Sequence, residues 1–137
     1  MIQVGYDAGL FHTDPAIVQQ KAVALQAQPA AQPTERSALA LIDTGAFASC
    51  IDEDLAQELQ LPLIDQQYGC GIGGAEKFNV YLAYIRIALI GTVQWGRFMG
   101  VKLRAAKQPH QALLGRTLLQ TMILVYDGRD GSVRLAV

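Results

Sequence analysis

The sequence contains few of the residues that metal sites and nucleic-acid interfaces require. Its 137 residues include two cysteines, Cys50 and Cys70, and two histidines, and no histidine accompanies the cysteines at the spacing of a zinc site. Its 11 basic and 12 acidic residues leave a net charge of −1 and are scattered along the chain. We therefore expect no metal, no other cofactor and no nucleic-acid partner, and we interpret both cysteines as buried or idle thiols.

Long apolar runs are also absent. No segment approaches the roughly 18 consecutive apolar residues of a membrane helix. Met1 to Pro15, which includes Asp7, His12 and Asp14, lacks the basic start and the apolar centre of a signal peptide. These features predict a cytoplasmic location and no membrane partner, and a mature fragment cut from a longer precursor would show the same features.

The motifs of serine and cysteine hydrolases are missing as well. The sequence has no Gly-x-Ser-x-Gly nucleophile elbow and no Cys-Gly-Ser-Cys segment. His110 would be the natural base for such a nucleophile. Without one, we interpret His110 as a loop residue.

The length and the apolar content fit one domain. Hydrophobic residues make up 51% of the chain, which suffices for a core and for an apolar interface. We expect a single domain over residues 1–137, in which residues 1–15 are an N-terminal extension to which the pattern assigns no structure.

Most of the pattern predicts short strands, so we expect an all-β fold. Pro29 and Pro33 separate the first expected strand from the second, and the two together would form a long hairpin. Gly91 is expected to turn between two later strands, and residues 126–132, rich in Asp and Gly, to turn the last hairpin. The expected strands are residues 16–26, 37–43, 80–89, 92–103, 121–126 and 133–137.

Two short helices interrupt the strands. Residues 51–59 have acids in the first turn and apolar residues at helical spacing, and Pro62 lies beyond their end. Residues 115–120 form the second expected helix. We interpret the three acids of the first helix, Asp52, Glu53 and Asp54, as solvated side chains.

One carboxylate stands out at the end of the apolar run 38–42. Asp43, Thr44, Gly45 and Ala46 follow this run directly, and Gly45 would let the backbone turn tightly with its N–H close to the carboxylate. Asp and Gly are ordinary turn residues, so the same tripeptide could simply end a strand. The strand before it and the helix pattern after it favour a functional turn.

A single such turn supplies half of a catalytic pair. Peptide hydrolysis without a metal or a covalent nucleophile needs one carboxylate to activate water and a second, protonated carboxyl to polarise the scissile carbonyl. The sequence has one Asp-Thr-Gly, and we interpret Asp127 and Asp130 as residues of the last hairpin turn. If the chain is an enzyme of this kind, a two-fold homodimer must bring Asp43 and its copy together.

A glycine-rich segment lies between two strand-like stretches. Gly71, Ile72, Gly73 and Gly74 predict a flexible hairpin tip that could approach a bound chain closely. A phosphate-binding loop is the alternative. It would need a Gly-Lys-Ser/Thr step followed by a helix, whereas a strand pattern, residues 78–82, follows here.

Together, the Asp43 turn, this glycine-rich hairpin and the later Leu113-Leu114-Gly115-Arg116 segment resemble the retropepsin-like aspartic proteases, from about residue 37 to residue 137. The resemblance implies a small closed β-barrel of the acid-protease fold with one or two short helices and a flap hairpin, and a bacterial member of the family is expected. It implies a homodimer that cleaves a peptide or protein substrate, with terminal strands of the two chains interdigitating.

The resemblance also assigns roles to residues. Asp43, Thr44 and Gly45 would be the catalytic loop, with the Thr44 hydroxyl bonded to the partner's identical loop. Pockets that select substrate side chains would be lined by Ala46, Phe47, Gly71, Ile72, Gly73, Gly74 and Leu113.

The chain departs from the retroviral pattern at one position beside this loop. Phe47 occupies the place of an acidic residue that usually pairs with the arginine of the later Gly-Arg segment, so Arg116 lacks its usual partner. Phe47 could instead form an apolar wall of the substrate site. Ala46, where pepsin has serine, goes by resemblance with activity at mildly acidic to near-neutral pH.

Three functions remain open from the sequence. The first is an aspartic endopeptidase with one Asp43 as base and the other as acid. The second is a protease-fold peptide-binding or assembly module whose catalytic pair is inert. The third, a phosphoryl-handling enzyme, would need a longer chain with further phosphate loops. Dependence of specific activity on protein concentration would separate the first two.

Overall fold

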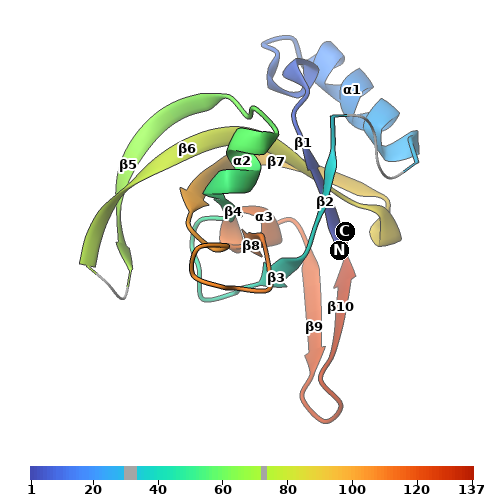
Figure 1. Cartoon of the computed structure of the whole chain (residues 1–137). Helices are drawn as coiled ribbons and strands as arrows, with labels where there is room; N and C mark the ends of the chain where they lie inside the picture. Colours follow the sequence, from blue (N-terminus) through green and yellow to red (C-terminus); the bar gives the residue numbers. More distant parts are fainter. Residues whose placement is uncertain (30–33, 72–73) are drawn as a thin grey trace.

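A computed structural model describes residues 1–29, 34–71 and 74–137, and it confirms the predicted all-β class (Figure 1). In chain order the elements are β1 (Ile2–Gly5), η1 (Ala8–Phe11), α1 (Pro15–Ala27), β2 (Arg36–Ala38), β3 (Ala40–Ile42), β4 (Cys50–Asp52), α2 (Glu53–Glu58), β5 (Leu63–Gly71), β6 (Gly74–Ile87), η2 (Ala88–Ile90), β7 (Thr92–Val101), β8 (Ala112–Leu114), α3 (Arg116–Leu119), β9 (Ile123–Asp127) and β10 (Ser132–Ala136).

One 8-stranded sheet curls round the core until its edges nearly meet. The strands follow the order β2-β1-β6-β7-β4-β8-β3, with β5 paired to β6 beside this path. The two edge strands, β2 and β3, are separated in the chain only by Leu39, so the sheet must bend back on itself. The result is a nearly closed barrel. Most pairs are antiparallel, but β3 pairs with β8, and β4 with β7, in parallel.

The first strand corrects the interpretation of residues 1–15 as an extension. All four residues of β1 are buried, and β1 lies between β2 and β6 in the sheet. Ile2 and Val4 belong to the main core. The strand is only four residues long, and its polar residue, Gln3, is buried with its amide bonded to the Ser37 hydroxyl at 2.8 Å, so a run this short at the start of the chain gave little strand signal.

The strand predicted for residues 16–26 is wrong, because this segment is the helix α1. The Asp14 carboxylate accepts a hydrogen bond from the Ala16 N–H at 2.9 Å, and Pro15 occupies the first helical position. Ala22 and Leu25 are buried beside Tyr84 and Val93 in a second, smaller core. The segment therefore covers the sheet as a helix and does not form the first arm of a hairpin.

A buried ion pair attaches the end of α1 to the sheet. The Arg86 guanidinium donates to the Gln28 carbonyl at 2.6 Å and to the Pro29 carbonyl at 2.8 Å, and it pairs with the Glu35 carboxylate. The side chains of Arg86 and Glu35 are 3% and 0% exposed. The Tyr84 hydroxyl donates to Glu35 at 2.6 Å, and burial is the main cause that raises the pKa of Tyr84.

The predicted glycine-rich hairpin exists as two long arms. β5 and β6 pair antiparallel out to Gly71 and Gly74, while Ile72 and Gly73 lie outside the described residues. Gly74 has a φ of 102°, in the region that favours glycine. Beyond Val80, β6 continues into the barrel and pairs with β7, and Gly91 makes the turn between the two strands as predicted.

The last two strands form a separate hairpin. β9 and β10 pair only with each other and project from the barrel (Figure 1). The predicted turn is confirmed, since the Gly131 N–H donates to the Asp127 carbonyl at 2.8 Å. The hairpin exposes several large apolar side chains: Ile123, Val125, Tyr126 and Val133.

Both predicted helices are present, but Asp52 and Glu53 are not the solvated acids that the sequence predicted. α2 begins at Glu53, after β4 rather than at residue 51, and α3 covers Arg116–Leu119. Asp52 is 1% exposed, and its carboxylate accepts from the Arg104 N–H at 2.9 Å. Asp52 is thus a buried anchor for the segment after β7, not a solvated acid. None of the described helices is long and apolar enough to cross a membrane.

Candidate functional site

Asp43 lies at the end of β3, in a turn that its own side chain organises. Its N–H continues the strand ladder by donating to the Leu114 carbonyl at 3.1 Å. Its Oδ1 accepts from the N–H groups of Gly45 at 2.9 Å and Ala46 at 3.1 Å. A Cβ on residue 45 would lie 3.1 Å from this oxygen, so glycine leaves room for the close approach. The half-buried carboxylate is therefore held in place without any charged partner from its own turn.

The loop from Asp43 to Ser49 is locked against the start of α3. A Cβ on Gly115 would lie 2.4 Å from the Ala48 carbonyl oxygen, a separation that no real side chain tolerates. The buried Ser49 hydroxyl accepts from the Gly115 N–H at 3.0 Å and lies 2.9 Å from the Thr117 hydroxyl. The Ser49 N–H donates to the same Thr117 oxygen at 3.1 Å. These neutral contacts join the Asp43 loop and the predicted Leu-Leu-Gly segment into one unit.

Arg116 completes this unit in a way that the sequence did not reveal. Its guanidinium donates to the carbonyls of Thr44 at 2.9 Å and Gly45 at 3.2 Å, and it lies 5.9 Å from the centre of the Phe47 ring. Backbone bonds run from Arg116 to Ala46 and from Thr117 to Phe47. The arginine thus braces the Asp43 turn through backbone carbonyls and an aromatic ring in place of an acidic partner.

Strand register brings further side chains to the face that carries Asp43. Leu41 is paired with Leu113, Leu113 with Cys50, and Cys50 with Met99. Paired residues of neighbouring strands point to the same face of a sheet. Because Ala112, Ile51 and Leu114 point into the core, these four side chains lie on the opposite, Asp43-bearing face.

The charge of the Asp43 carboxylate affects the pKa of the Cys50 thiol. Burial, and after it the negative charge of Asp43, raises the pKa of Cys50 from 9.0 to about 11. A neutral thiol therefore lies on the Asp43-bearing face. Leu41, Cys50 and Met99 were missed from the sequence, since their place depends on the pairing of strands that lie far apart in the chain.

The structure places the predicted site residues in two groups. Thr44 and Phe47 are exposed, and Ala46 and Leu113 are half-buried, all on or beside the Asp43 turn. Gly71 and Gly74 lie at the end of the β5–β6 hairpin, and the predicted roles of Ile72 and Gly73 fall outside the described residues. In Figure 1 the hairpin end and the loop after β3 lie on the same side of the molecule.

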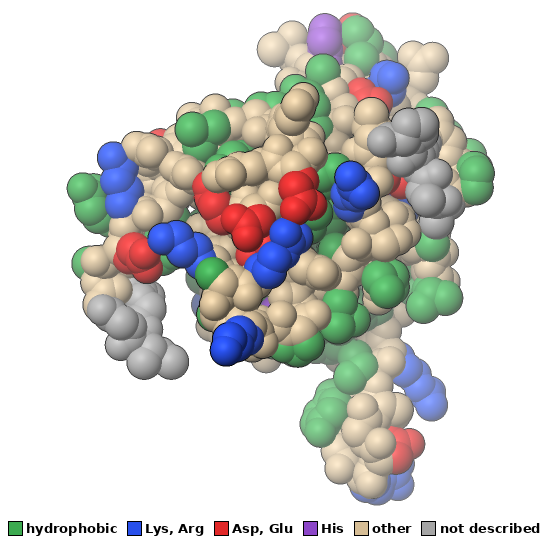
Figure 2. Space-filling view, in the orientation of Figure 1, with side chains coloured by type: hydrophobic (Ala, Val, Ile, Leu, Met, Phe, Trp, Pro, Cys, Tyr) green, Lys and Arg blue, Asp and Glu red, His purple; other side chains and the backbone are tan. Residues whose placement is uncertain are grey.

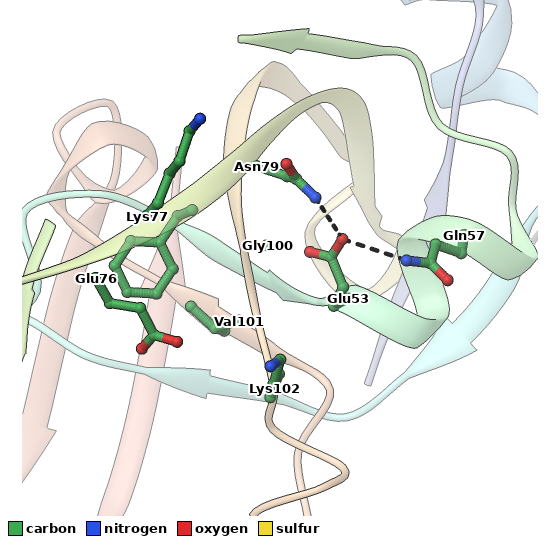
Figure 3. Close-up of a pocket in the computed structure, with 9 residues that line it drawn as sticks. Glu53, Gln57, Glu76, Lys77, Asn79, Gly100, Val101 and Lys102 are labelled. Carbon is green, nitrogen blue, oxygen red and sulfur yellow. Dashed lines mark hydrogen bonds between the residues drawn. The ribbon is translucent and has the colours of Figure 1, made fainter. Parts of the chain in front are cut away.

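Neither of two pockets of about 330 Å³ is lined by residues 43–46. The first is polar and is bounded by α2, the free edge of β6 and the end of β7 (Figure 3). The second is largely apolar and lies between the barrel and the β9–β10 hairpin, with Ile42, Leu89 and Leu135 in its wall. Within the described residues, no three His, Cys, Asp or Glu side chains gather in a way that could hold a metal ion.

Comparison with known proteins finds a similarity in fold. No protein-family model matches the chain, and no curated protein matches it in sequence. In fold the chain is similar to the solution structure of the simian foamy virus (mac) protease, with 18% sequence identity and a TM-score of 0.43. The similarity covers 59% of this chain and 78% of the viral one. A functional assignment therefore rests on the geometry of the site itself.

Proposed function

We propose that this chain is one half of a homodimeric aspartic endopeptidase, in which Asp43 and its copy activate water. The observation that carries the proposal is the Asp43 turn, whose Oδ1 is held by two backbone N–H groups while the loop is braced by Arg116 and locked to Gly115. A carboxylate fixed by short neutral contacts is suited to face a second carboxylate without rearranging.

The chemistry follows from placing two such carboxyls together. Like charges a few ångströms apart do not both ionise readily, so the pair shares a proton over a range of pH. The ionised member takes a proton from water as the water attacks the peptide carbonyl. The protonated member donates to the carbonyl oxygen, and the amine leaves with a proton from the pair.

The C-terminal hairpin offers a surface on which a second copy of the chain could bind. Its exposed apolar residues, among them Val125, Tyr126 and Val133, stand next to an apolar pocket of the barrel. Such a patch is unusual on a monomer and typical of a protein–protein interface. A two-fold dimer supplies the second Asp43, because the chain carries a single Asp-Thr-Gly turn.

A peptide substrate would lie along the Asp43-bearing face as an added strand. The side chains of Leu41, Leu113, Cys50 and Met99 line this face and favour apolar substrate residues. With its pKa raised to about 11, the Cys50 thiol stays neutral at physiological pH and acts as a small apolar group. The role of Gly71 to Gly74 as a flap over the peptide stays a prediction.

The test is cleavage of a diverse peptide mixture by the purified chain, over a range of pH and protein concentration, read by mass spectrometry. An Asp43→Asn variant and the inhibitor pepstatin are the controls. Asparagine keeps the Oδ1 acceptor for Gly45 and Ala46, so the variant is expected to fold and to dimerise.

We expect cuts that vanish in Asp43→Asn and that rise more steeply than linearly with protein concentration. Cuts that persist in Asp43→Asn would refute the mechanism. A demonstrated dimer that binds pepstatin but cuts nothing in the mixture would favour the inert peptide-binding module.

A further inference from the structure

Glu53 stands in the wall of the polar pocket, outside the proposed catalytic machinery. It is the first residue of α2 and directly follows β4, the strand that carries Cys50 on the Asp43-bearing face. Figure 3 shows its side chain between Asn79 of the β5–β6 hairpin and Gln57 of α2. Glu53 therefore lies at the junction of the site and the hairpin.

The Glu53 carboxylate collects donors from both sides of this junction. Its Oε1 accepts from the Tyr81 hydroxyl at 2.5 Å, from the Asn79 amide at 2.8 Å and from the Gln57 amide at 3.3 Å. Burial, and after it the bond to Glu53, raises the pKa of Tyr81, so its hydroxyl stays a donor. Two of the three donors belong to β6.

Asn79 extends the contact to the other arm of the hairpin. Its side-chain oxygen accepts from the Gln66 amide of β5 at 2.9 Å. One carboxylate is thus linked, directly or through Asn79, to both arms.

The backbone of β7 leaves space for this carboxylate. A Cβ on Gly100 would lie 2.0 Å from Oε2 of Glu53 and 2.9 Å from the Tyr81 ring. Any side chain at position 100 would displace Glu53, so a glycine is required here for the contact to form.

Among the described residues, few other polar contacts join the hairpin to the barrel near Glu53. β6 pairs with β7 only from Val80 onward, so residues 74–79 pair with β5 alone. Arg97 of β7 pairs with Asp65 of β5 at 2.6 Å, but both side chains are about half exposed. Exposed ion pairs of this kind contribute little to stability. In the described part of the chain, Glu53 is therefore the best-buried polar link between the arms and the barrel.

We infer that Glu53 is a positioning residue: its carboxylate holds the arms of the β5–β6 hairpin in a fixed orientation relative to β4, and hence to Asp43. The value of that orientation for peptide binding rests on the proposed function. The link between Glu53 and the hairpin arms does not rest on the proposed function.

The experiment compares amide hydrogen exchange in Glu53→Ala and in the unmodified full chain. We expect exchange in residues 63–69 and 75–79 to speed up about tenfold, since charged hydrogen bonds that restrain local opening are lost. Residues 82–87, in the barrel part of β6, should exchange at an unchanged rate. Asp54→Asn is the matched control, because it removes the same charge one residue away, from an exposed side chain.

Peptide binding provides the second readout, with pepstatin as the probe. We expect Glu53→Ala to weaken pepstatin binding and to raise KM with little change in kcat, while Glu53→Gln, which keeps an oxygen acceptor for Tyr81 and Asn79, restores part of both. Asp54→Asn should behave like the unmodified chain.

Three results would overturn the inference: unchanged exchange in the arms, equally faster exchange throughout the protein, or faster exchange in the arms with unchanged pepstatin affinity and KM. If the unmodified chain neither cuts peptides nor binds pepstatin, the proposed function fails. The exchange comparison then still decides whether Glu53 holds the hairpin.

Discussion

The Asp43 loop and the end of α1 are both attached to the barrel by buried polar groups, but by different kinds of group. The loop is held by neutral hydrogen bonds, by the fit of Gly115 against Ala48, and by the Arg116 guanidinium, which donates to backbone carbonyls of the loop. The helix end is held by the buried charges of Arg86 and Glu35. None of the loop contacts joins a charged side chain to the Asp43 carboxylate itself, whereas the helix end is held by a buried ion pair.

The largest effect is expected from Arg86→Ala. The change removes the cation that faces the buried Glu35 carboxylate and three backbone carbonyls, and breaking a buried pair in this way costs about 3–5 kcal/mol. Chemical denaturation measures the free energy of unfolding. Arg97→Ala, which breaks the exposed pair with Asp65, is the control and should cost less than about 1 kcal/mol. Equal losses in the two variants would show that the buried pair has no special role.

A smaller effect is expected from Gly115→Ala. The new Cβ would meet the Ala48 carbonyl at 2.4 Å, so the Asp43 loop must shift, at a cost of about 1–3 kcal/mol. We expect peptide cleavage to fall by more than this loss of stability explains, because the loop carries the proposed catalytic group. Gly96→Ala is the control, since a Cβ there would meet nothing within 4 Å. Full activity in Gly115→Ala would contradict a locked loop.

The smallest effect concerns Cys50, whose alkylation can be followed with iodoacetamide in a Cys70→Ser background. Because its pKa is raised from 9.0 to about 11, the reactive thiolate is about a hundredfold scarcer below pH 9 than in a free thiol. Asp43→Asn removes the smaller of the two causes and thereby lowers the pKa. The reaction should therefore speed up, but by less than tenfold. No change in rate would place Asp43 too far from Cys50 to line one site with it.

The elements that the sequence revealed are those with strong local signals. The strands around Gly91 and the hairpin turn at Asp127 were predicted correctly, since alternation and turn residues lie within a few positions of each other. The helix α1 was missed although Asp14 and Pro15 form an ordinary helix start. Its small apolar residues alternate loosely, a pattern that also fits a strand.

The predictions for polar residues were wrong where the partners of these residues lie far away in the sequence. Asp52 and Glu53 look like the solvated first turn of a helix, yet one is buried against the backbone of Arg104 and the other binds Tyr81. In the same way Arg116, which lacks an acidic neighbour in sequence, finds carbonyls in the Asp43 turn. No local pattern encodes such contacts.

By itself, the sequence determined the all-β class, the Asp43 turn and the hairpin turns at Gly91 and Asp127, because each depends on residues within a few positions of one another. Only the tertiary structure decided which side chains surround Asp43 and what holds the β5–β6 hairpin. Cys50, Leu113 and Met99 reach one face through the register of three strands. Register is set by packing of the whole barrel, and a shift of one residue would turn every one of these side chains to the other face.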